Sequence, residues 1–415
     1  MIRVRFAPSP TGVPHIGNTR TALYNWLFAR HNGGKLILRI EDTDQARLVP
    51  GSQEKILEIL KFLNLSWDEG PYRQSERLAL YKKYAQGLVD KGSAYESEGA
   101  IRLRVAQDRE MVWQDLIQGE IRIKTRGMND PVLLKSDGFP TYHLAVVVDD
   151  HLMEISHILR AAEWISSTPK HLLIYEALGW KSPEMGHFSV ILGPDKAKLS
   201  KRHGAKSVLD YRDEGYLPQA LLTFMAYLGW TYEDNSKLLT LEELIEHFDL
   251  KQVHKANPIF DQEKLNYFNG LAIRQMNQME LIKNLRPFVP KDCPEDLVAK
   301  ILPLVQERLV KLGDWEEMTE FFYRQVKPDK TVLVKEQLKV SQQLIEGLGD
   351  WRAEILEEKF RQEAGARNWQ PGQFFAMLRM AVTGRKVTPP LFATMEVVGK
   401  REVIKRLENA QKYCP

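Results

Sequence analysis

A loop near the start of the chain combines a histidine, a glycine and an asparagine at the start of a predicted helix. These residues are His15, Gly17 and Asn18, and the turn-forming run 8–12 (PSPTG) precedes them. A helix N-terminus presents unpaired N–H groups and a partial positive charge that suit phosphate groups, and glycine lets a ligand approach the backbone closely. His15 and Asn18 would donate further hydrogen bonds to phosphate oxygens. An ordinary Pro/Gly loop with one histidine explains the same residues equally well.

A second loop, much later in the chain, places three cations around a serine. Its residues are Lys198, Leu199, Ser200, Lys201 and Arg202. Such a group can neutralise charge that develops on a triphosphate as pyrophosphate leaves, and electrostatic stabilisation of this kind is often the largest catalytic contribution. By itself, however, a basic run is more often a solvated surface loop. The two loops share phosphate chemistry only if the fold brings them to one cleft.

The elements around the first loop are typical of an α/β nucleotide-binding fold. Alternation predicts a strand over 2–6, helical spacing predicts a helix over 19–31 that Gly33 and Gly34 end, and a second strand follows over 35–40. Strand, loop, helix and strand form the first unit of a doubly wound parallel sheet.

The chain then leaves this fold for an inserted segment and returns to it. In order, the patterns predict helices over 53–63 and 76–91, strands over 101–105 and 120–124, an apolar strand over 141–148, helices near 162–178, and a Lys- and Gly-rich loop over 192–208. The second candidate loop therefore follows the last strand of the sheet.

Beyond Gly229 and Trp230 the pattern becomes helical throughout. The segments with helical spacing are 241–248, 265–268, 295–312, 315–324, 353–364, 374–382 and 401–413. We expect the C-terminal third to be an all-helical module.

Composition excludes several classes of protein. The 415 residues carry a net charge of +3, which permits a polyanionic partner without requiring one, and the two cysteines, Cys293 and Cys414, are far apart. The longest apolar runs, 144–148 and 221–228, are much shorter than the ~20 residues that span a bilayer, and the N-terminus has no apolar signal region. We expect a soluble cytoplasmic protein without a disulfide framework or a thiolate zinc site.

The two loops together match the ATP signatures of class I aminoacyl-tRNA synthetases, and further motifs resemble the bacterial-type glutamyl-tRNA synthetases. These motifs are RFAPSPTG (5–12), RIEDTD (39–44), PYRQSER (71–77), DGFPTY (137–142) and VDDH (148–151). The resemblance covers nearly the whole chain. It implies a Rossmann-like catalytic domain with an α+β insertion, followed by an all-helical C-terminal tRNA-binding region.

The resemblance also implies domain boundaries. The expected parts are the first half of the catalytic domain (1–92), a shortened insertion that binds the tRNA acceptor end (93–140), the second half of the catalytic domain (141–230), a helical stem-contact domain (231–300) and a helical anticodon-binding domain (301–415).

The resemblance also implies site residues, most of which lie in these motifs or in the two loops. The implied sets are Arg5, Ala7, Ser9, Glu41, Tyr142 and Arg160 for glutamate; His15, Gly17, Glu163, Trp164, Lys198 and Lys201 for ATP; and His15, Asn18, Lys198, Ser200, Lys201 and Arg202 for catalysis, with no residue as a metal ligand. Their chemistry is suitable, because an arginine can clamp a carboxylate through two hydrogen bonds and Glu41 can pair with an ammonium group. Standing alone, Arg5 would be an ordinary strand charge and Glu41 a helix cap.

The implied reaction has two steps and uses ATP with Mg²⁺. The α-carboxylate of L-glutamate attacks the α-phosphate, and the terminal ribose hydroxyl of tRNA(Glu) then takes the glutamyl group. Arg308 aligns with a position that reads the last anticodon base, although an exposed arginine on an amphipathic helix explains it as well. The resemblance further implies a monomer.

The chain departs from the family at three places. It is short between Gly70 and Pro71 and between Tyr95 and Ile101, where relatives hold the tRNA acceptor end; we expect exposed residues to have been left out of the sequence there rather than deleted. Val146 replaces an asparagine that some members bring near the substrate, so that part of the pocket would depend on backbone or water.

Other functions share parts of this pattern. The nearest is an enzyme that also glutamylates tRNA(Gln). A small-substrate nucleotidyltransferase shares the fold but lacks the long helical end, as do truncated relatives that modify a tRNA base. A tRNA-binding protein without catalysis would not need His15, Lys198, Ser200 and Lys201.

Overall fold

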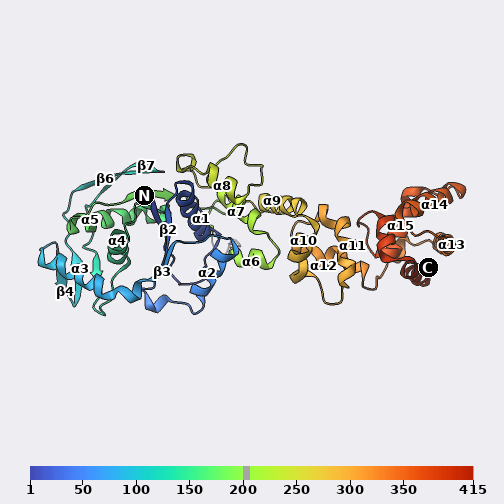
Figure 1. Cartoon of the computed structure of the whole chain (residues 1–415), viewed down its shortest axis with the longest axis horizontal. Helices are drawn as coiled ribbons and strands as arrows, with labels where there is room; N and C mark the ends of the chain where they lie inside the picture. The colour runs from blue at the N-terminus through green and yellow to red at the C-terminus, as the bar shows by residue number, and fades with distance from the viewer. Residues whose placement is uncertain (200–205, 415) are drawn as a thin grey trace. The chain divides into compact units, whose positions relative to one another are not determined.

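The computed structural model describes residues 1–199 and 206–414, and they form two compact units. The first unit contains residues 1–213 and 218–268, and the second contains 214–217 and 269–415. All of the described strands belong to the first unit (Figure 1). No described helix is long and apolar enough to cross a membrane.

A parallel sheet forms the centre of the first unit. β1 (Arg3–Phe6), β2 (Lys35–Ile40) and β3 (Glu69–Arg73) pair in that order. β9 (His157–Ala161) follows the other edge of β1, where Ser156 N donates to Arg3 O at 2.9 Å, and β10 (Glu184–Phe188) pairs with β9 in parallel. The strands predicted over 2–6 and 35–40 are thus confirmed, and the carboxyl ends of β1, β2 and β9 lie at one edge.

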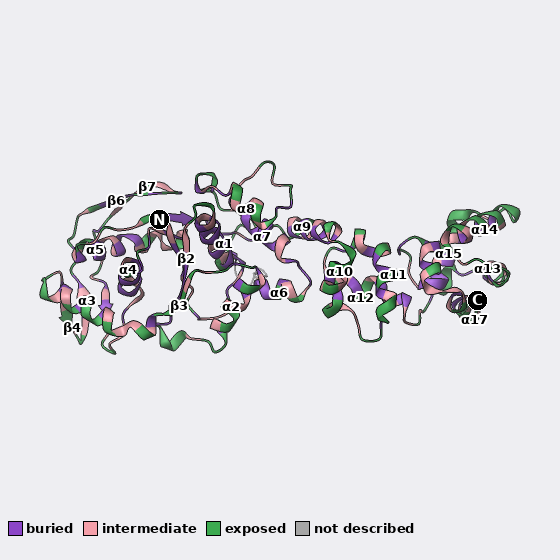
Figure 2. Cartoon of the chain, viewed as in Figure 1, coloured by how far each residue is buried: buried purple, intermediate pink, exposed green. Residues whose placement is uncertain are grey.

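Helix α1 (Ile16–His31) follows the first loop and is buried over most of its surface (Figure 2). It contacts β1, β2 and β9, and also α7 (Pro218–Tyr227) and α8 (Leu241–His247). Enclosure by strands and helices explains why apolar residues occur around the whole helix and not along one stripe. The helix begins one turn earlier than its periodicity predicts.

The apolar strand predicted over 141–148 is wrong, because this segment forms helix α4 (Tyr142–Leu152). Seven successive residues, 144–150, are buried, so the sequence shows no polar face from which a helical period could be read. The three valines at 146–148 favour a strand by propensity alone. Packing of α4 against α3 (Leu78–Asp90) and α5 (Thr168–Leu178) overrides that preference.

The inserted segment consists of short antiparallel strands. β4 (Ala94–Ser97), β5 (Ala100–Leu103) and β8 (Val132–Leu134) form one sheet, while β7 (Gly119–Lys124) pairs with β6 (Glu110–Asp115). β6 also meets β10 in parallel at the pair Met185 and Asp115, so the insertion rejoins the central sheet there.

The stretch that is short relative to the family is closed by a regular hairpin. β4 and β5 pair without interruption from Ala94 opposite Leu103 to Ser97 opposite Ala100. The turn residues Glu98 and Gly99 have φ of 54° and 75°, as a two-residue turn of the hairpin type requires.

The first unit contains further helices, which lie between the strands or after β10 in the sequence. They are α2 (Ser52–Phe62), α6 (Val208–Asp213) and the start of α9 (Gln262–Gln275), together with a 3₁₀ helix over Ala162–Ser167 that precedes α5. The helices predicted over 53–63 and near 162–178 are confirmed.

The second unit is helical throughout its described part. Its helices are α10 (Gln278–Leu285), α11 (Glu295–Val305), α12 (Trp315–Thr319), α13 (Lys335–Glu346), α14 (Ala353–Ala366), α15 (Pro371–Thr383), α16 (Leu391–Val398) and α17 (Lys400–Tyr413). The helix predicted over 295–312 ends early at Val305. The chain turns there, and Leu312 N donates to Gly215 O at 3.0 Å instead of continuing the helix.

Candidate active site

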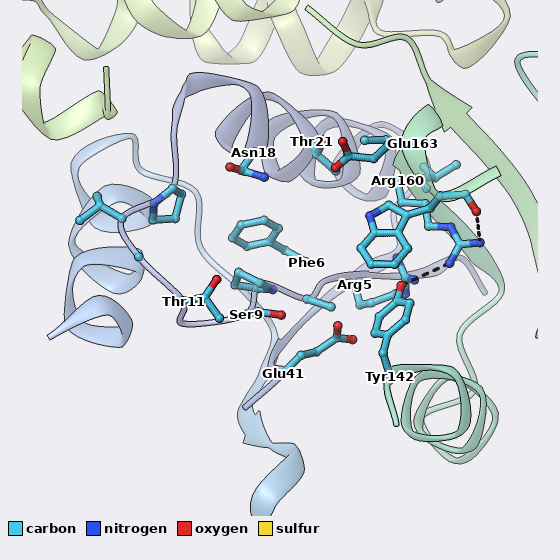
Figure 3. Close-up of a pocket in the computed structure, with 18 residues that line it drawn as sticks. Arg5, Phe6, Ser9, Thr11, Asn18, Thr21, Glu41, Tyr142, Arg160 and Glu163 are labelled. Carbon is cyan, nitrogen blue, oxygen red and sulfur yellow. Dashed lines mark hydrogen bonds between the residues drawn. The ribbon is translucent and has the colours of Figure 1, made fainter. Parts of the chain in front are cut away.

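A pocket of about 330 Å³ opens at the carboxyl edge of the parallel sheet. It gathers the side chains that were assigned to glutamate from separate elements: Arg5 at the end of β1, Ala7 and Ser9 in the following loop, Glu41 after β2, Tyr142 at the start of α4 and Arg160 on β9 (Figure 3). Glu163 and Trp164, from the 3₁₀ helix after β9, also line the cavity. Residues more than a hundred positions apart therefore share one cavity.

A buried ion-pair network holds one side of this pocket. Arg39 is fully buried and donates to Glu41 Oε1 at 2.9 Å and to Asp150 Oδ1 at 2.7 Å, and its Nε lies 3.8 Å from Asp149 Oδ2. Arg5 Nε donates to the same Asp150 oxygen at 3.1 Å. Asp150 thus bridges two arginines, and only Arg5 lines the cavity.

The charges of this network shift its acids in opposite directions. Burial by itself raises the pKa of Asp150, but the neighbouring Arg5 and Arg39 guanidinium groups bring it below its usual value. For Glu41 burial prevails over Arg39 and raises the pKa. A carboxylate with a raised pKa gains most from a cationic partner, and an ammonium group in the pocket would supply one.

Arg160 forms the other side of the pocket and is surrounded by polar groups that carry no formal charge. Its Nε donates to His187 Nε2 at 3.1 Å and its Nη1 contacts His171 Nδ1 at 3.1 Å. Longer contacts join it to the hydroxyl of Tyr142 at 3.3 Å and to Trp164 O at 3.4 Å (Figure 3). The rings of Tyr142 and Trp164 lie 4.4 Å apart between centroids and wall this end of the cavity.

A smaller pocket beside the start of α1 brings the two candidate loops together. It is lined by His15, Gly17, Asn18, Glu163 and Lys198, among others. Lys198 forms an ion pair with Glu163 across it. At the far end of the second loop, Ile16 N donates to Lys206 O at 3.2 Å and His15 bridges to Ser207, so both described ends of this loop lie beside the first.

The helix start is arranged differently from the prediction. The first backbone N–H groups are not left open, because His15 Nδ1 accepts from Gly17 N at 3.0 Å and from Asn18 N at 3.4 Å. Glycine is required at position 17 for this arrangement, since a Cβ there would lie 2.9 Å from the His15 ring. His15 therefore caps α1 in this structure and has to turn away before those amides can reach a phosphate.

The remaining assigned residues lie elsewhere or outside the description. Ser200, Lys201 and Arg202 lie outside the described residues. Arg308 is exposed in the second unit, where its Nη1 donates to Thr388 O at 2.7 Å. Val146 is buried in the apolar core around α4 and does not line the pocket.

Several residues that support the pocket carried no role in the sequence analysis. Arg39, Asp149 and Asp150 lay within quoted motifs, where a basic residue inside a strand and paired acids after an apolar run were the available signal. Asp115, His171 and His187 stood in no motif, so no sequence signal marked them.

Comparisons with known proteins agree with this geometry. The family model described as tRNA synthetases class I (E and Q), catalytic domain, matches residues 1–100 and 96–267, and the model of an anticodon binding domain matches 280–411. The chain therefore belongs to the class I tRNA synthetases of the E and Q type.

Its relatives within that class carry one name. A glutamate–tRNA ligase of Dehalococcoides mccartyi is 44% identical over 471 positions, covering 99% of this chain and 97% of the relative, and that of Herpetosiphon aurantiacus is 39% identical with 98% and 97% covered. A solved glutamate tRNA ligase from Elizabethkingia meningosepticum, in complex with its amino acid, has a TM-score of 0.89 at 33% identity and 99% coverage of both chains. The 471 aligned positions exceed the 415 residues here, so the first relative has internal residues that this chain lacks.

Proposed function

We propose that this chain activates L-glutamate with ATP and transfers it to the 3′ end of tRNA(Glu). The observation that carries the proposal is one cavity in which Arg5 and Arg160 lie with Glu41, while Glu163, which also lines it, is paired with Lys198. The side-chain carboxylate and the ammonium group of glutamate carry opposite charges, so the two arginines and Glu41 are complementary to them. The names of the relatives support the same activity.

The two arginines are the proposed ligands of the glutamate side chain. Among the described residues Arg5 donates through Nε to Asp150, so both of its terminal nitrogens are open to a carboxylate there. Arg160 makes its two longest contacts to Tyr142 and Trp164, which line the pocket, and a substrate carboxylate would replace these first. Glu41 would pair with the ammonium group of glutamate. Ala7 and Ser9, in the loop after β1, would line the same part of the pocket.

The smaller pocket is the proposed site for the phosphates of ATP. His15, Gly17, Asn18 and Lys198 would contact phosphate oxygens, and Glu163 and Trp164 would lie beside the nucleoside. Lys198 has to leave Glu163 to do so. Ser200, Lys201 and Arg202, which lie outside the described residues, are proposed to neutralise the leaving pyrophosphate.

The proposed chemistry needs no covalent bond to the protein. In the first step an oxygen of the glutamate α-carboxylate forms a bond to the α-phosphorus of ATP while the bond to the pyrophosphate oxygen breaks. In the second, the terminal ribose oxygen of tRNA attacks the activated carbonyl, loses its proton and releases AMP. The contribution of the protein is to align these groups and to oppose the developing negative charge.

Magnesium fits the smaller pocket as an ion carried by ATP. Glu163 is the carboxylate that lines the described part of this pocket, and Mg²⁺ typically uses one or two carboxylates together with substrate phosphates. When bound, the ion supplies charge neutralisation at the phosphates.

Domain roles follow from the same proposal. The segments 1–92 and 141–230 would form the catalytic domain, 93–140 would hold the acceptor end, 231–300 would contact the stem and 301–415 would read the anticodon. Arg308 is the proposed reader of the last anticodon base, and a monomer in the cytoplasm is the expected working form.

Charging of purified tRNA with labelled glutamate tests the function directly. We expect ATP-dependent charging of tRNA(Glu); a protein that leaves tRNA(Glu) uncharged in the presence of ATP would contradict the proposal. Charging of tRNA(Gln) in the same assay separates the enzyme that serves both tRNAs from the one that serves only tRNA(Glu). An Arg308→Gln variant with an unchanged ratio between the two tRNAs would remove the role of Arg308.

A further inference from the structure

Arg160 is a buried cation without a carboxylate partner in the described part of the chain. Its exposed fraction is 5%, and its described hydrogen bonds go to His187, His171, Thr168, Trp164 and Tyr142, none of which carries a negative charge. Removing a guanidinium from water without an anionic partner is costly, so the surrounding acceptors have to be well placed. The identity and orientation of these acceptors therefore decide where the charge points.

The contact with His187 fixes the tautomer of that imidazole. A guanidinium N–H can only donate, so His187 Nε2, at 3.1 Å from Arg160 Nε, has to be the unprotonated nitrogen. The proton then resides on Nδ1, which faces Asp115 Oδ2 at 2.5 Å. A carboxylate that accepts from one imidazole nitrogen leaves the other nitrogen as an acceptor.

Asp115 is itself held in a single orientation. It is 1% exposed, and its Oδ1 accepts from the backbone N–H of Ile117 at 3.1 Å, of Gln118 at 2.9 Å and of His187 at 3.1 Å. These backbone donors come from the turn after β6 and from β10, which pair at Asp115 and Met185. The inserted segment thus delivers a fixed carboxylate to the back of the pocket.

Two hydrogen-bonded imidazoles, those of His171 and His143, lie at the Nη1 side of the Arg160 guanidinium. His171 Nδ1 faces Arg160 Nη1 at 3.1 Å, so its Nε2 carries the proton and donates to His143 Nδ1 at 3.0 Å. Burial lowers the pKa of His171 well below its usual value and that of His143 to about 4, and in both groups the positive charge of Arg160 adds to the effect. Both rings are therefore neutral near pH 7, as acceptors for a guanidinium must be.

We propose that Asp115, His187 and His171 are positioning residues that fix the direction of the Arg160 guanidinium while leaving its charge for the substrate carboxylate. The inference rests on the proposed function, since it concerns the side of the pocket assigned to the glutamate side chain. A carboxylate placed directly against Arg160 would hold it as firmly but would cancel the charge that attracts an anionic substrate. An imidazole between Asp115 and Arg160 supplies orientation without that cancellation.

An Asp115→Asn variant tests the tautomer argument. The asparagine oxygen can still accept from the three backbone N–H groups, but its NH₂ would donate to His187 Nδ1 and move the imidazole proton to Nε2. Two donors would then face each other at the Arg160 contact. We expect the KM for glutamate in tRNA charging to rise about tenfold or more, with the KM for ATP and the melting temperature close to wild type.

Controls separate positioning from a general effect on the fold. Asp130→Asn is the matched variant, because Asp130 accepts from Val105 N and Tyr95 within the insertion and does not line the pocket, so glutamate KM should stay at the wild-type value. If Asp115→Asn does not fold, His187→Gln and His187→Leu decide: the glutamine oxygen can accept from Arg160, and leucine cannot. Glutamate KM should then be near wild type for glutamine and raised for leucine.

The possible results separate a failure of the proposed function from a failure of the positioning role. A wild-type protein that does not charge tRNA with glutamate overturns the proposed function, and the positioning role falls with it. A wild-type protein that charges tRNA, together with an unchanged glutamate KM in folded Asp115→Asn, overturns the positioning role alone. Equal KM values for His187→Gln and His187→Leu would do the same.

Discussion

Two buried arginines support one pocket, Arg160 within its lining and Arg39 behind it, and their hydrogen-bond partners differ in charge. Arg39 is fully buried among three carboxylates, those of Glu41, Asp149 and Asp150. Arg160 is nearly as deeply buried but faces imidazole, hydroxyl and carbonyl acceptors in the described structure. The charge of Arg39 is balanced by these carboxylates and stabilises the fold. The charge of Arg160 is not balanced by a described carboxylate, so an anionic ligand can pair with it. The comparison shows how the same residue type can serve structure at one position and recognition at another.

The largest expected effect on activity comes from removing Arg160, which has no described carboxylate partner. Arg160→Met should lower kcat/KM for glutamate by about 10³-fold or more, because a buried charge complementary to the substrate is lost. Stability should remain within about 1 kcal/mol of wild type or increase, since an uncompensated buried charge is removed. Steady-state charging kinetics and urea unfolding measure the two quantities. A variant that keeps wild-type kcat/KM would exclude Arg160 from recognition.

The reciprocal change should act on the fold. Arg39→Met leaves three buried acids without their shared cation, and we expect a loss of about 3–5 kcal/mol in the free energy of unfolding. Arg77→Met is the matched control, because Arg77 donates to Asp149 at 2.8 Å from a partly exposed position and should cost about 1 kcal/mol. Similar losses of unfolding free energy for Arg39→Met and Arg160→Met would contradict the different roles of the two arginines.

A pH dependence sharpens the account of the imidazole side. The pKa of His143 is lowered from its ordinary 6.5 to about 4, first by burial and then by Lys170 and Arg160. A group whose folded pKa is lowered contributes stability that is present above the unfolded pKa and lost as pH falls towards the folded value. His143→Asn should therefore reduce the stability lost between pH 7.5 and pH 5 by about 1–2 kcal/mol. Equal losses in both proteins would contradict the shift.

The smallest effect is expected at the exposed ion pair of the phosphate pocket. Glu163 and Lys198 are both largely exposed, and such pairs contribute about 0–1 kcal/mol. The ATP phosphates would supply Mg²⁺ with ligands that do not come from the protein, so Glu163→Gln should change the KM for ATP by less than about fivefold and leave the KM for glutamate unaltered. An effect of about a hundredfold on either constant would show that the pair is more than a surface contact.

The sequence predicted the residues that line the pocket better than the residues that hold them in place. Arg5, Glu41 and Tyr142 lie in the quoted motifs, Arg160 was assigned from the family resemblance, and the structure places all four around one cavity. The roles assigned to them, like the domain boundaries, stay predictions. Helices with an exposed face, such as α2 and α17, were also predictable, because one polar stripe reveals their period.

The support depends on pairings that no local pattern reveals. Asp115 and His187 are 72 positions apart and meet only because β6 joins β10. α4 was wrongly predicted as a strand for a related reason. Neighbouring elements cover most of its surface, so its sequence shows no helical period. In both cases tertiary contacts, which a single sequence does not show, determine the local structure.

A crystal structure of the protein with bound L-glutamate tests the central claim most directly. The account predicts the side-chain carboxylate within about 3.2 Å of the Arg160 guanidinium, with the ammonium group at Glu41 and the Asp115 to His187 contact intact. Glutamate bound with its side chain away from Arg160, or with its ammonium group at Arg5, would contradict the account.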